Sequence, residues 1–169
     1  MATMTMTKRR SRTQTTPENN PRHPLAMPAT VSIEMWERFS FYGMQAILAY
    51  YLYYATTDGG LGLERAQATT LLGAYGASVY LCTLAGGWIG DRLIGTERTL
   101  LTGCIALMVG HLSLSTLSGG AGATFGLALI AIGSGFVKTA AITILGHAYP
   151  TDDPRRDAGF QLFYLGINI

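Results

Sequence analysis

The sequence is poor in charged residues and in cysteine. Only 13% of its 169 residues are Asp, Glu, Lys or Arg, and 49% are hydrophobic, whereas about 25% of the residues in soluble domains are charged. This excludes an ordinary soluble domain and favours an integral membrane protein built from α-helices. The two cysteines, Cys82 and Cys104, lie in apolar runs without His or acidic residues at ligand spacing. We therefore expect them to pack, and we expect neither a metal site nor a disulfide.

Patterns typical of enzymes and of secretion signals are also missing. No Ser/His/Asp arrangement, metal-ligand spacing or phosphate-binding loop is present, so neither an enzyme nor a cofactor is expected. Residues 1–28 carry five basic residues and one acidic residue, without the apolar stretch of a cleaved signal. We interpret them as a disordered basic tail. A nucleic-acid-binding arm is less favoured, because no aromatic residues alternate with the charges.

Long uncharged runs divide the rest of the chain, residues 29–169, into membrane helices. Crossing a hydrocarbon core of about 30 Å takes roughly 20 apolar residues. The pattern predicts an all-α, polytopic membrane helix bundle with helices over residues 29–55, 64–89, 99–117 and 123–148, and an incomplete fifth over 158–169. Residues 118–122 form the expected hairpin between the third and fourth helices. Because the sequence stops within a helical pattern, we expect a fragment of a longer protein.

The basic residues predict how this bundle is oriented. Lys and Arg concentrate in the N-terminal tail and in the loops after the second and fourth helices. Cytoplasmic loops are enriched in Lys and Arg. We therefore expect a multi-pass protein of the plasma membrane with a cytoplasmic N-terminus.

The first predicted helix carries an unusual charged stripe. At about 100° per residue, Glu34, Arg38 and Gln45 lie within roughly 60° of one another, with Glu37 on the flank of the stripe. A charge inside a bilayer costs about 2.5–3.5 kcal/mol on insertion scales, so such residues normally face partners or water. The stripe favours a wet cavity inside the bundle. Alternatively, the charges lie at the headgroup level and only residues 39–57 span the membrane.

The fourth predicted helix contains a single lysine, Lys138. At 1.5 Å per residue, Glu37, Arg38 and Lys138 lie roughly 12–16 Å from the cytoplasmic end of their helices. The charges of these residues and Glu34 sum to zero, as expected of a matched buried set. We predict that Glu34, Glu37, Arg38 and Lys138 form a proton-coupling group. Alternatively, Lys138 extends to the headgroups.

Residues 34–43 resemble the ExxERFxYYG signature of the proton-dependent oligopeptide transporters, a branch of the major facilitator superfamily. Two positions depart from the family pattern: Phe41 replaces a tyrosine, and Gln45 replaces an arginine that many bacterial members carry. A neutral amide at position 45 loses the bidentate charge that would hold a peptide carboxylate. The family's fourth helix has a comparable Gly-x-Gly-x-x-Lys context around Lys138.

The resemblance implies roles for further residues. The family's FYxxIN motif matches the fifth helix and includes Asn168, and residues 87–95 resemble the major facilitator loop between the second and third helices. Tyr80 is equally compatible with simple packing, and the loop with a solvated turn. The implied substrate-binding residues are Tyr42, Gln45, Tyr80, Lys138 and Asn168, and the implied conformational latch is Asp91 and Arg92.

The function implied by the resemblance is proton-coupled symport of di- and tripeptides. In this mechanism, protonation of a glutamate releases Lys138 for an anionic substrate group. The expected partners are small peptides, the lipid bilayer and the C-terminal half of the same transporter; no nucleic acid is expected, and the proton is the coupling ion. The alternatives are a proton-coupled transporter of nitrate or another small anion or metabolite, and a membrane assembly subunit that does not transport.

Overall fold

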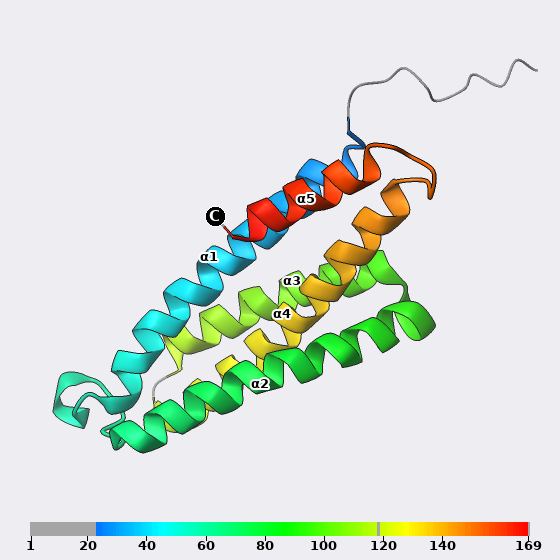
Figure 1. The fold of residues 1–169 in the computed structure, drawn as a ribbon. Helices are drawn as coiled ribbons and strands as arrows, with labels where there is room; N and C mark the ends of the chain where they lie inside the picture. Colours follow the sequence, from blue (N-terminus) through cyan, green and yellow to red (C-terminus); the bar gives the residue numbers. More distant parts are fainter. Residues whose placement is uncertain (1–22, 118, 169) are drawn as a thin grey trace, which may run out of the picture.

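The computed structural model describes residues 23–117 and 119–168. This part of the chain folds into five α-helices and contains no β-strand (Figure 1). A 3₁₀ turn, Thr56–Asp58, follows the first helix, and a π-helical turn, Gly90–Ile94, extends the second. The α-helices are α1 (Ala26–Tyr53), α2 (Arg65–Ile89), α3 (Thr96–Thr116), α4 (Gly119–Ala148) and α5 (Arg156–Ile167).

Helix α4 lies at the centre of the bundle. It packs against α3, α2 and α1, and α5 lies beside the first half of α1 (Figure 1). The start of α1, the α2–α3 turn and the α4–α5 loop lie at one end of the bundle, and the α1–α2 loop lies at the other. The basic loops identified in the sequence therefore share one end.

Glycines allow the close packing around α4. A Cβ atom added at Gly135 would lie 2.5 Å from the backbone carbonyl carbon of Cys82 on α2. One added at Gly133 would lie 2.7 Å from the carbonyl oxygen of Gly103 on α3. Backbone atoms cannot rotate away from such contacts, so small residues set the separation of these helices.

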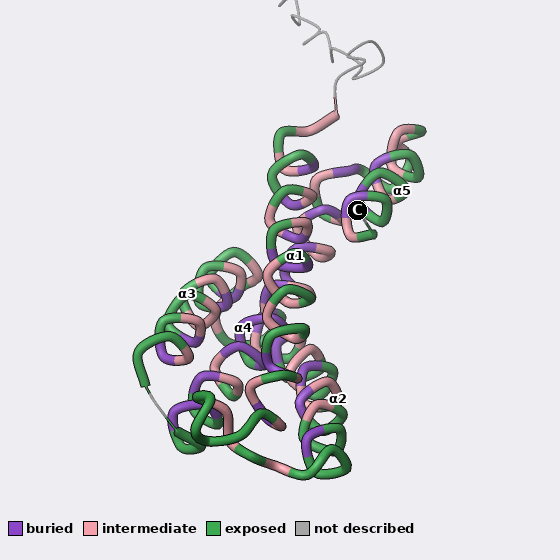
Figure 2. The backbone as a smooth tube through the Cα atoms, turned by 90° about the vertical axis from the view of Figure 1, so that its left-hand side faces the viewer, coloured by how far each residue is buried: buried purple, intermediate pink, exposed green. Residues whose placement is uncertain are grey.

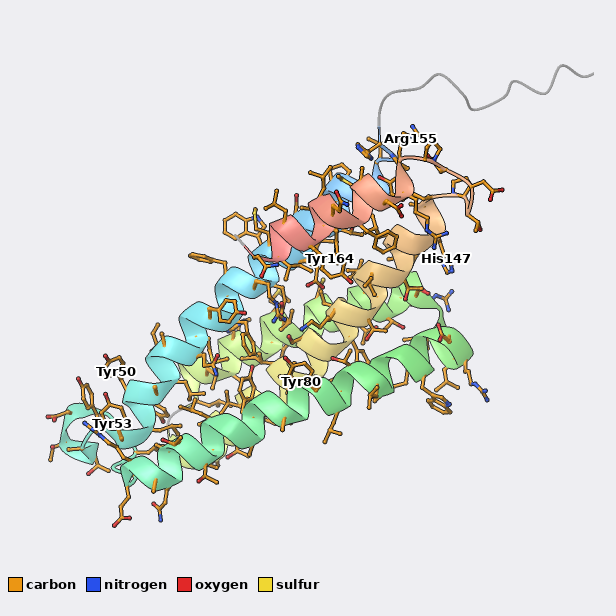
Figure 3. The ribbon with its side chains drawn as sticks, in the orientation of Figure 1. Tyr50, Tyr53, Tyr80, His147, Arg155 and Tyr164 are labelled. Carbon is orange, nitrogen blue, oxygen red and sulfur yellow. The ribbon has the colours of Figure 1, made fainter. Side chains whose placement is uncertain are left out.

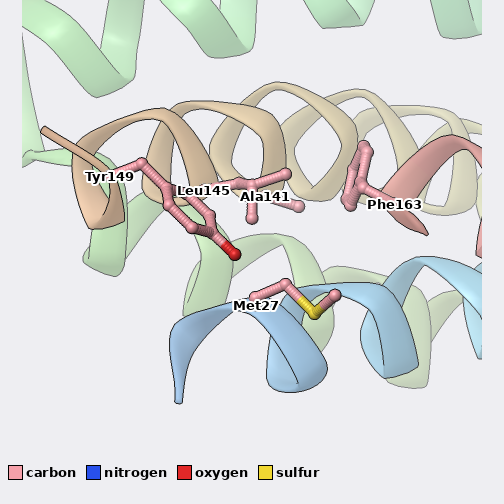
Figure 4. Close-up of a cluster of buried hydrophobic side chains, with 5 residues drawn as sticks. All are labelled: Met27, Ala141, Leu145, Tyr149 and Phe163. Carbon is pink, nitrogen blue, oxygen red and sulfur yellow. The ribbon is translucent and has the colours of Figure 1, made fainter. Parts of the chain in front are cut away.

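A second feature of the packing is a buried apolar cluster that joins three segments distant in sequence. Met27 from α1, Ala141 and Leu145 from α4, Tyr149 just after α4, and Phe163 from α5 are all buried and form one cluster (Figure 4). The Tyr149 hydroxyl lies 2.7 Å from Nδ1 of His23. The cluster fixes α5 and the start of α1 against the end of α4.

Several helix boundaries differ from those predicted. Helix α1 begins at Ala26 instead of residue 29, because the first-turn amides of a helix need no internal partner and Pro28 is tolerated there. Helix α3 begins at Thr96 instead of residue 99, directly after Gly95 with φ of 84°. The predicted hairpin is shorter, since α4 begins at Gly119 and includes residues 120–122. Residues 1–22 of the predicted tail lie outside the described residues.

Composition distinguishes α1 from the other long helices. Within the described residues, three helical segments are long and apolar enough to cross a membrane: Arg65–Ile94, Thr96–Thr116 and Gly119–Ala148. Helix α1 is not among them, and it carries Glu34, Glu37 and Arg38. Exposed residues run along α2 and α3 (Figure 2), and many are large and apolar, such as Leu84 and Leu101. The fold is an all-α, polytopic membrane helix bundle, as the sequence predicted.

Candidate functional site: a buried charge cluster between α1 and α4

The centre of the candidate site is a cluster of three hydrogen-bonded side chains. Nε of Arg38 donates to Oε2 of Glu37 at 2.5 Å. The Ser134 hydroxyl on α4 donates to the other carboxylate oxygen, Oε1, and accepts a bond from Nη2 of Arg38 at 3.3 Å. Glu37 and Arg38 are less than 10% exposed, and Ser134 is fully buried. The cluster ties α1 to α4 in the bundle interior.

Glu34 lies one helical turn before this cluster and has a different environment. Its side chain is fully buried, and neither carboxylate oxygen has a hydrogen-bond partner among the described residues. Burying a carboxylate without a hydrogen bond is costly. Glu34 thus differs from Glu37, whose two carboxylate oxygens both have donors.

Lys138 is half-buried on the same helix as Ser134. Its ammonium nitrogen lies 5.4 Å from the centre of the Tyr80 ring, which projects from α2 toward α4 (Figure 3). Within the described part of the chain, no carboxylate lies within 4.0 Å of this nitrogen, although the charge of Lys138 does act on Glu34. Within the predicted set, the contacting ion pair is Glu37–Arg38, and Lys138 lies beside Tyr80 instead.

The predicted substrate-binding residues fall into separate groups. Tyr42 and Asn168 line a groove of about 750 Å³ between α1 and α5, together with Arg38. The Asn168 amide donates to the carbonyl oxygen of Tyr164 at 2.6 Å. Gln45 is half-buried and does not line this groove, and Tyr80 contacts Lys138, as described above.

Phe41, where the resembling family has tyrosine, supports the charge cluster. The guanidinium carbon of Arg38 lies 5.0 Å from the centre of the Phe41 ring, a favourable cation–π position. Phe41 also stacks on Tyr75 of α2, with ring centres 5.9 Å apart. The aromatic ring therefore performs a packing role here that requires no hydroxyl.

Two residues of the site were not singled out from the sequence. Ser134 lies four residues before Lys138 and hence on the same helix face, a spacing that could have identified it. The ring of His111 on α3 hydrogen-bonds the Ser40 hydroxyl at 2.9 Å, and both residues line a cavity of about 370 Å³ that also reaches Glu37. No local pattern indicated this role for His111, because the contact depends on how α3 approaches α1.

The predicted latch lies at the end of the bundle, away from the cluster. Asp91 and Arg92 are exposed on the π-helical turn after α2, and neither forms an ion pair with another described residue. Within residues 23–117 and 119–168, no group of three or more His, Cys, Asp or Glu side chains is arranged to hold a metal ion.

Comparison with known proteins identifies relatives of this chain. A sequence model of the POT family matches residues 97–169. A di-/tripeptide transporter of Lactococcus lactis subsp. lactis is 47% identical over 148 residues, which cover 86% of this chain and 30% of the relative. The family match covers α3 to α5, and the match to the transporter covers most of the chain.

Solved structures agree with the sequence relatives. A crystal structure of the peptide transporter POT in complex with sulfate matches with a TM-score of 0.83 and 44% identity, covering 86% of this chain and 30% of that one. A POT family transporter in complex with 5-aminolevulinic acid has a TM-score of 0.83 and 39% identity over the same shares. The chain thus spans about 30% of the length of the relatives it matches.

Proposed function

Because this chain belongs to the POT family, we propose that it is the N-terminal part of a proton-coupled symporter of di- and tripeptides. The proposal concerns the complete transporter, since the chain spans about 30% of its relatives. The substrate class is taken from the relative named as a di-/tripeptide transporter.

The observation that carries the proposal is the buried charge cluster. Glu34 and Glu37 are buried on α1, and Glu37 is bound to the guanidinium of Arg38. Ionisable residues inside a membrane protein are costly and normally serve a transport pathway. A structural ion pair alone would not need a second buried carboxylate, Glu34, that has no hydrogen-bond partner among the described residues.

In the proposed cycle, the proton and the substrate change which charges are paired. Protonation of Glu34 or Glu37 removes one negative charge from the cluster and weakens the attraction on Lys138. Lys138 then binds the carboxylate of the peptide beside Tyr80, while Tyr42 and Asn168 contact the peptide from the groove. The altered pairing biases the equilibrium between inward-open and outward-open states, and the exposed turn with Asp91 and Arg92 serves as the latch.

The proposed orientation follows from the basic loops. Arg92 lies in the turn between α2 and α3 and Arg155 in the loop between α4 and α5, while Arg98 and Arg156 lie in the first turns of α3 and α5. These segments share the end of the bundle where α1 begins (Figure 1). Loops rich in Lys and Arg normally face the cytoplasm, so we place this end and the N-terminus there, with the plasma membrane as the location.

The decisive experiment measures proton-driven uptake by the complete transporter in liposomes. A labelled dipeptide should accumulate when an inward proton gradient is imposed, and Glu37→Gln or Lys138→Ala should abolish this accumulation. Glu97→Gln is the matched control, because Glu97 is an exposed acid at the start of α3. Undiminished accumulation by either site variant would reject the mechanism.

A second candidate is transport of another small carboxylate or anion. It is favoured by the neutral Gln45 at the position of the family arginine, and by the relative whose structure contains 5-aminolevulinic acid. Competition of labelled dipeptide uptake by nitrate, 5-aminolevulinic acid and unlabelled tripeptide would distinguish the two. Dipeptide transport predicts that the tripeptide competes and that nitrate does not.

A further inference from the structure

Ser134 makes the contact with Glu37 that the proton-coupling hypothesis assigned to Lys138. Both oxygens of the Glu37 carboxylate have donors, and the donors are Arg38 and Ser134. The charge of Glu37 is balanced by Arg38 at 2.5 Å. A neutral pair of this kind attracts Lys138 only weakly.

The hydroxyl of Ser134 is exceptional in leaving its own helix for a charged partner. Ser113 on α3 donates to the carbonyl oxygen of Val109, and Thr143 on α4 donates to that of Thr139. Such bonds to the preceding turn satisfy a hydroxyl locally and are common for Ser and Thr in membrane helices. Ser134 instead crosses to Glu37 and also accepts a bond from Arg38.

The spacing of Ser134 and Lys138 places both donors on the face of α4 that contacts Glu37 through Ser134. They are four residues apart on α4 and therefore lie on one face of the helix. The nitrogen of Lys138 lies over the Tyr80 ring, so of these two donors on one face of α4 only Ser134 is bonded to Glu37.

We propose that Ser134 is a positioning residue that holds Glu37 on Arg38 and thereby keeps Lys138 available for an anionic group of the substrate. Without the hydroxyl, Oε1 of Glu37 loses its donor, and the inference is that the ammonium of Lys138, one helical turn away on the same face of α4, takes its place. Lys138 would then be withdrawn from the substrate. This inference rests on the proposed function and adds a residue to it.

The test is a double-mutant cycle on the complete transporter, with the dissociation constant of a labelled dipeptide measured on purified protein. Ser134→Ala should weaken dipeptide binding about tenfold, as expected for loss of a hydrogen bond to a charged group. In a Glu37→Gln background the same substitution should change the dissociation constant less than about twofold, since the neutral amide does not capture Lys138. Ser113→Ala, which removes a buried hydroxyl bonded within its own helix, should leave binding unchanged.

The outcomes separate positioning from a merely structural role. Unaltered binding in Ser134→Ala, or equal weakening with and without Glu37, would overturn the inference. The thermal unfolding temperature of each variant identifies any weakening that arises from misfolding, and the cycle is then repeated with Ser134→Cys. Failure of the unsubstituted transporter to bind any dipeptide would refute the proposed function instead.

Discussion

Gly135 sets the distance between α4 and α2, and its replacement by alanine should destabilise the protein and weaken substrate binding. The added Cβ would lie 2.5 Å from the carbonyl carbon of Cys82 and 2.6 Å from the amide nitrogen of Thr83. An ordinary contact needs at least 3.4 Å, so the helices must separate by roughly 1 Å. Overpacking of this kind costs about 1–3 kcal/mol.

Two effects determine the size of the Gly135→Ala change. Alanine gains about 1 kcal/mol over glycine in helix propensity, which leaves a net destabilisation of up to about 2 kcal/mol, with the upper end expected because backbone atoms must move. The separation also lengthens the bond from the Thr139 hydroxyl to the carbonyl oxygen of Thr83, now 2.8 Å. Lys138 lies three residues after Gly135, and Tyr80 lies two residues before Cys82. The two side chains therefore move apart when the helices separate.

The assay combines thermal unfolding of the purified transporter with its affinity for a labelled dipeptide. Gly135→Ala should lower the unfolding temperature and weaken binding. Gly76→Ala on α2 is the matched control, because a Cβ there meets nothing within 4 Å; it should be neutral or slightly stabilising. Equal unfolding temperatures for the two variants would refute the packing argument.

Three further substitutions test other parts of the structure. Tyr75→Phe removes a buried hydroxyl that has no hydrogen-bond partner among the described residues and should leave the free energy of unfolding unchanged or raise it by up to about 1 kcal/mol; a clear fall in the unfolding temperature would contradict this. Phe163→Ala removes a side chain that is 2% exposed and should cost about 3–5 kcal/mol, with faster proteolysis of the α4–α5 loop; unchanged proteolysis would contradict the cluster. Hydrogen bonds from Arg155 lower the pKa of Asp153 to about 2, from an ordinary value of 3.8. A depressed pKa contributes stability above the ordinary value that is lost only as the pH falls toward 2. Asp153→Asn should therefore leave the pH dependence of uptake at neutral and mildly acidic pH unchanged, and a shifted profile would contradict this.

The charged stripe of α1 could be recognised from the sequence because helical periodicity fixes which residues share a face. Glu34, Glu37 and Arg38 fall on adjoining positions of a helix that is otherwise apolar, and the cost of burying charge indicates an interior site. Depth along each helix follows from a constant rise per residue. For this reason the numbering alone predicts that Lys138 and the glutamates lie at similar depths.

Which donor contacts which carboxylate depended on the tertiary structure. The contacts between α1 and α4 depend on how α4 packs against its other neighbours, and glycines bring α4 close to Cys82 of α2 and Gly103 of α3, both distant in sequence. The sequence predicted a set of charged residues, and Glu37 and Arg38 are neighbours on α1, whereas the approach of α4 brought Ser134 to Glu37 and left Lys138 over Tyr80. The contact of His111 with Ser40 was likewise decided by the tertiary structure. Periodicity along one helix carries no information about the side chain that a neighbouring helix brings to it.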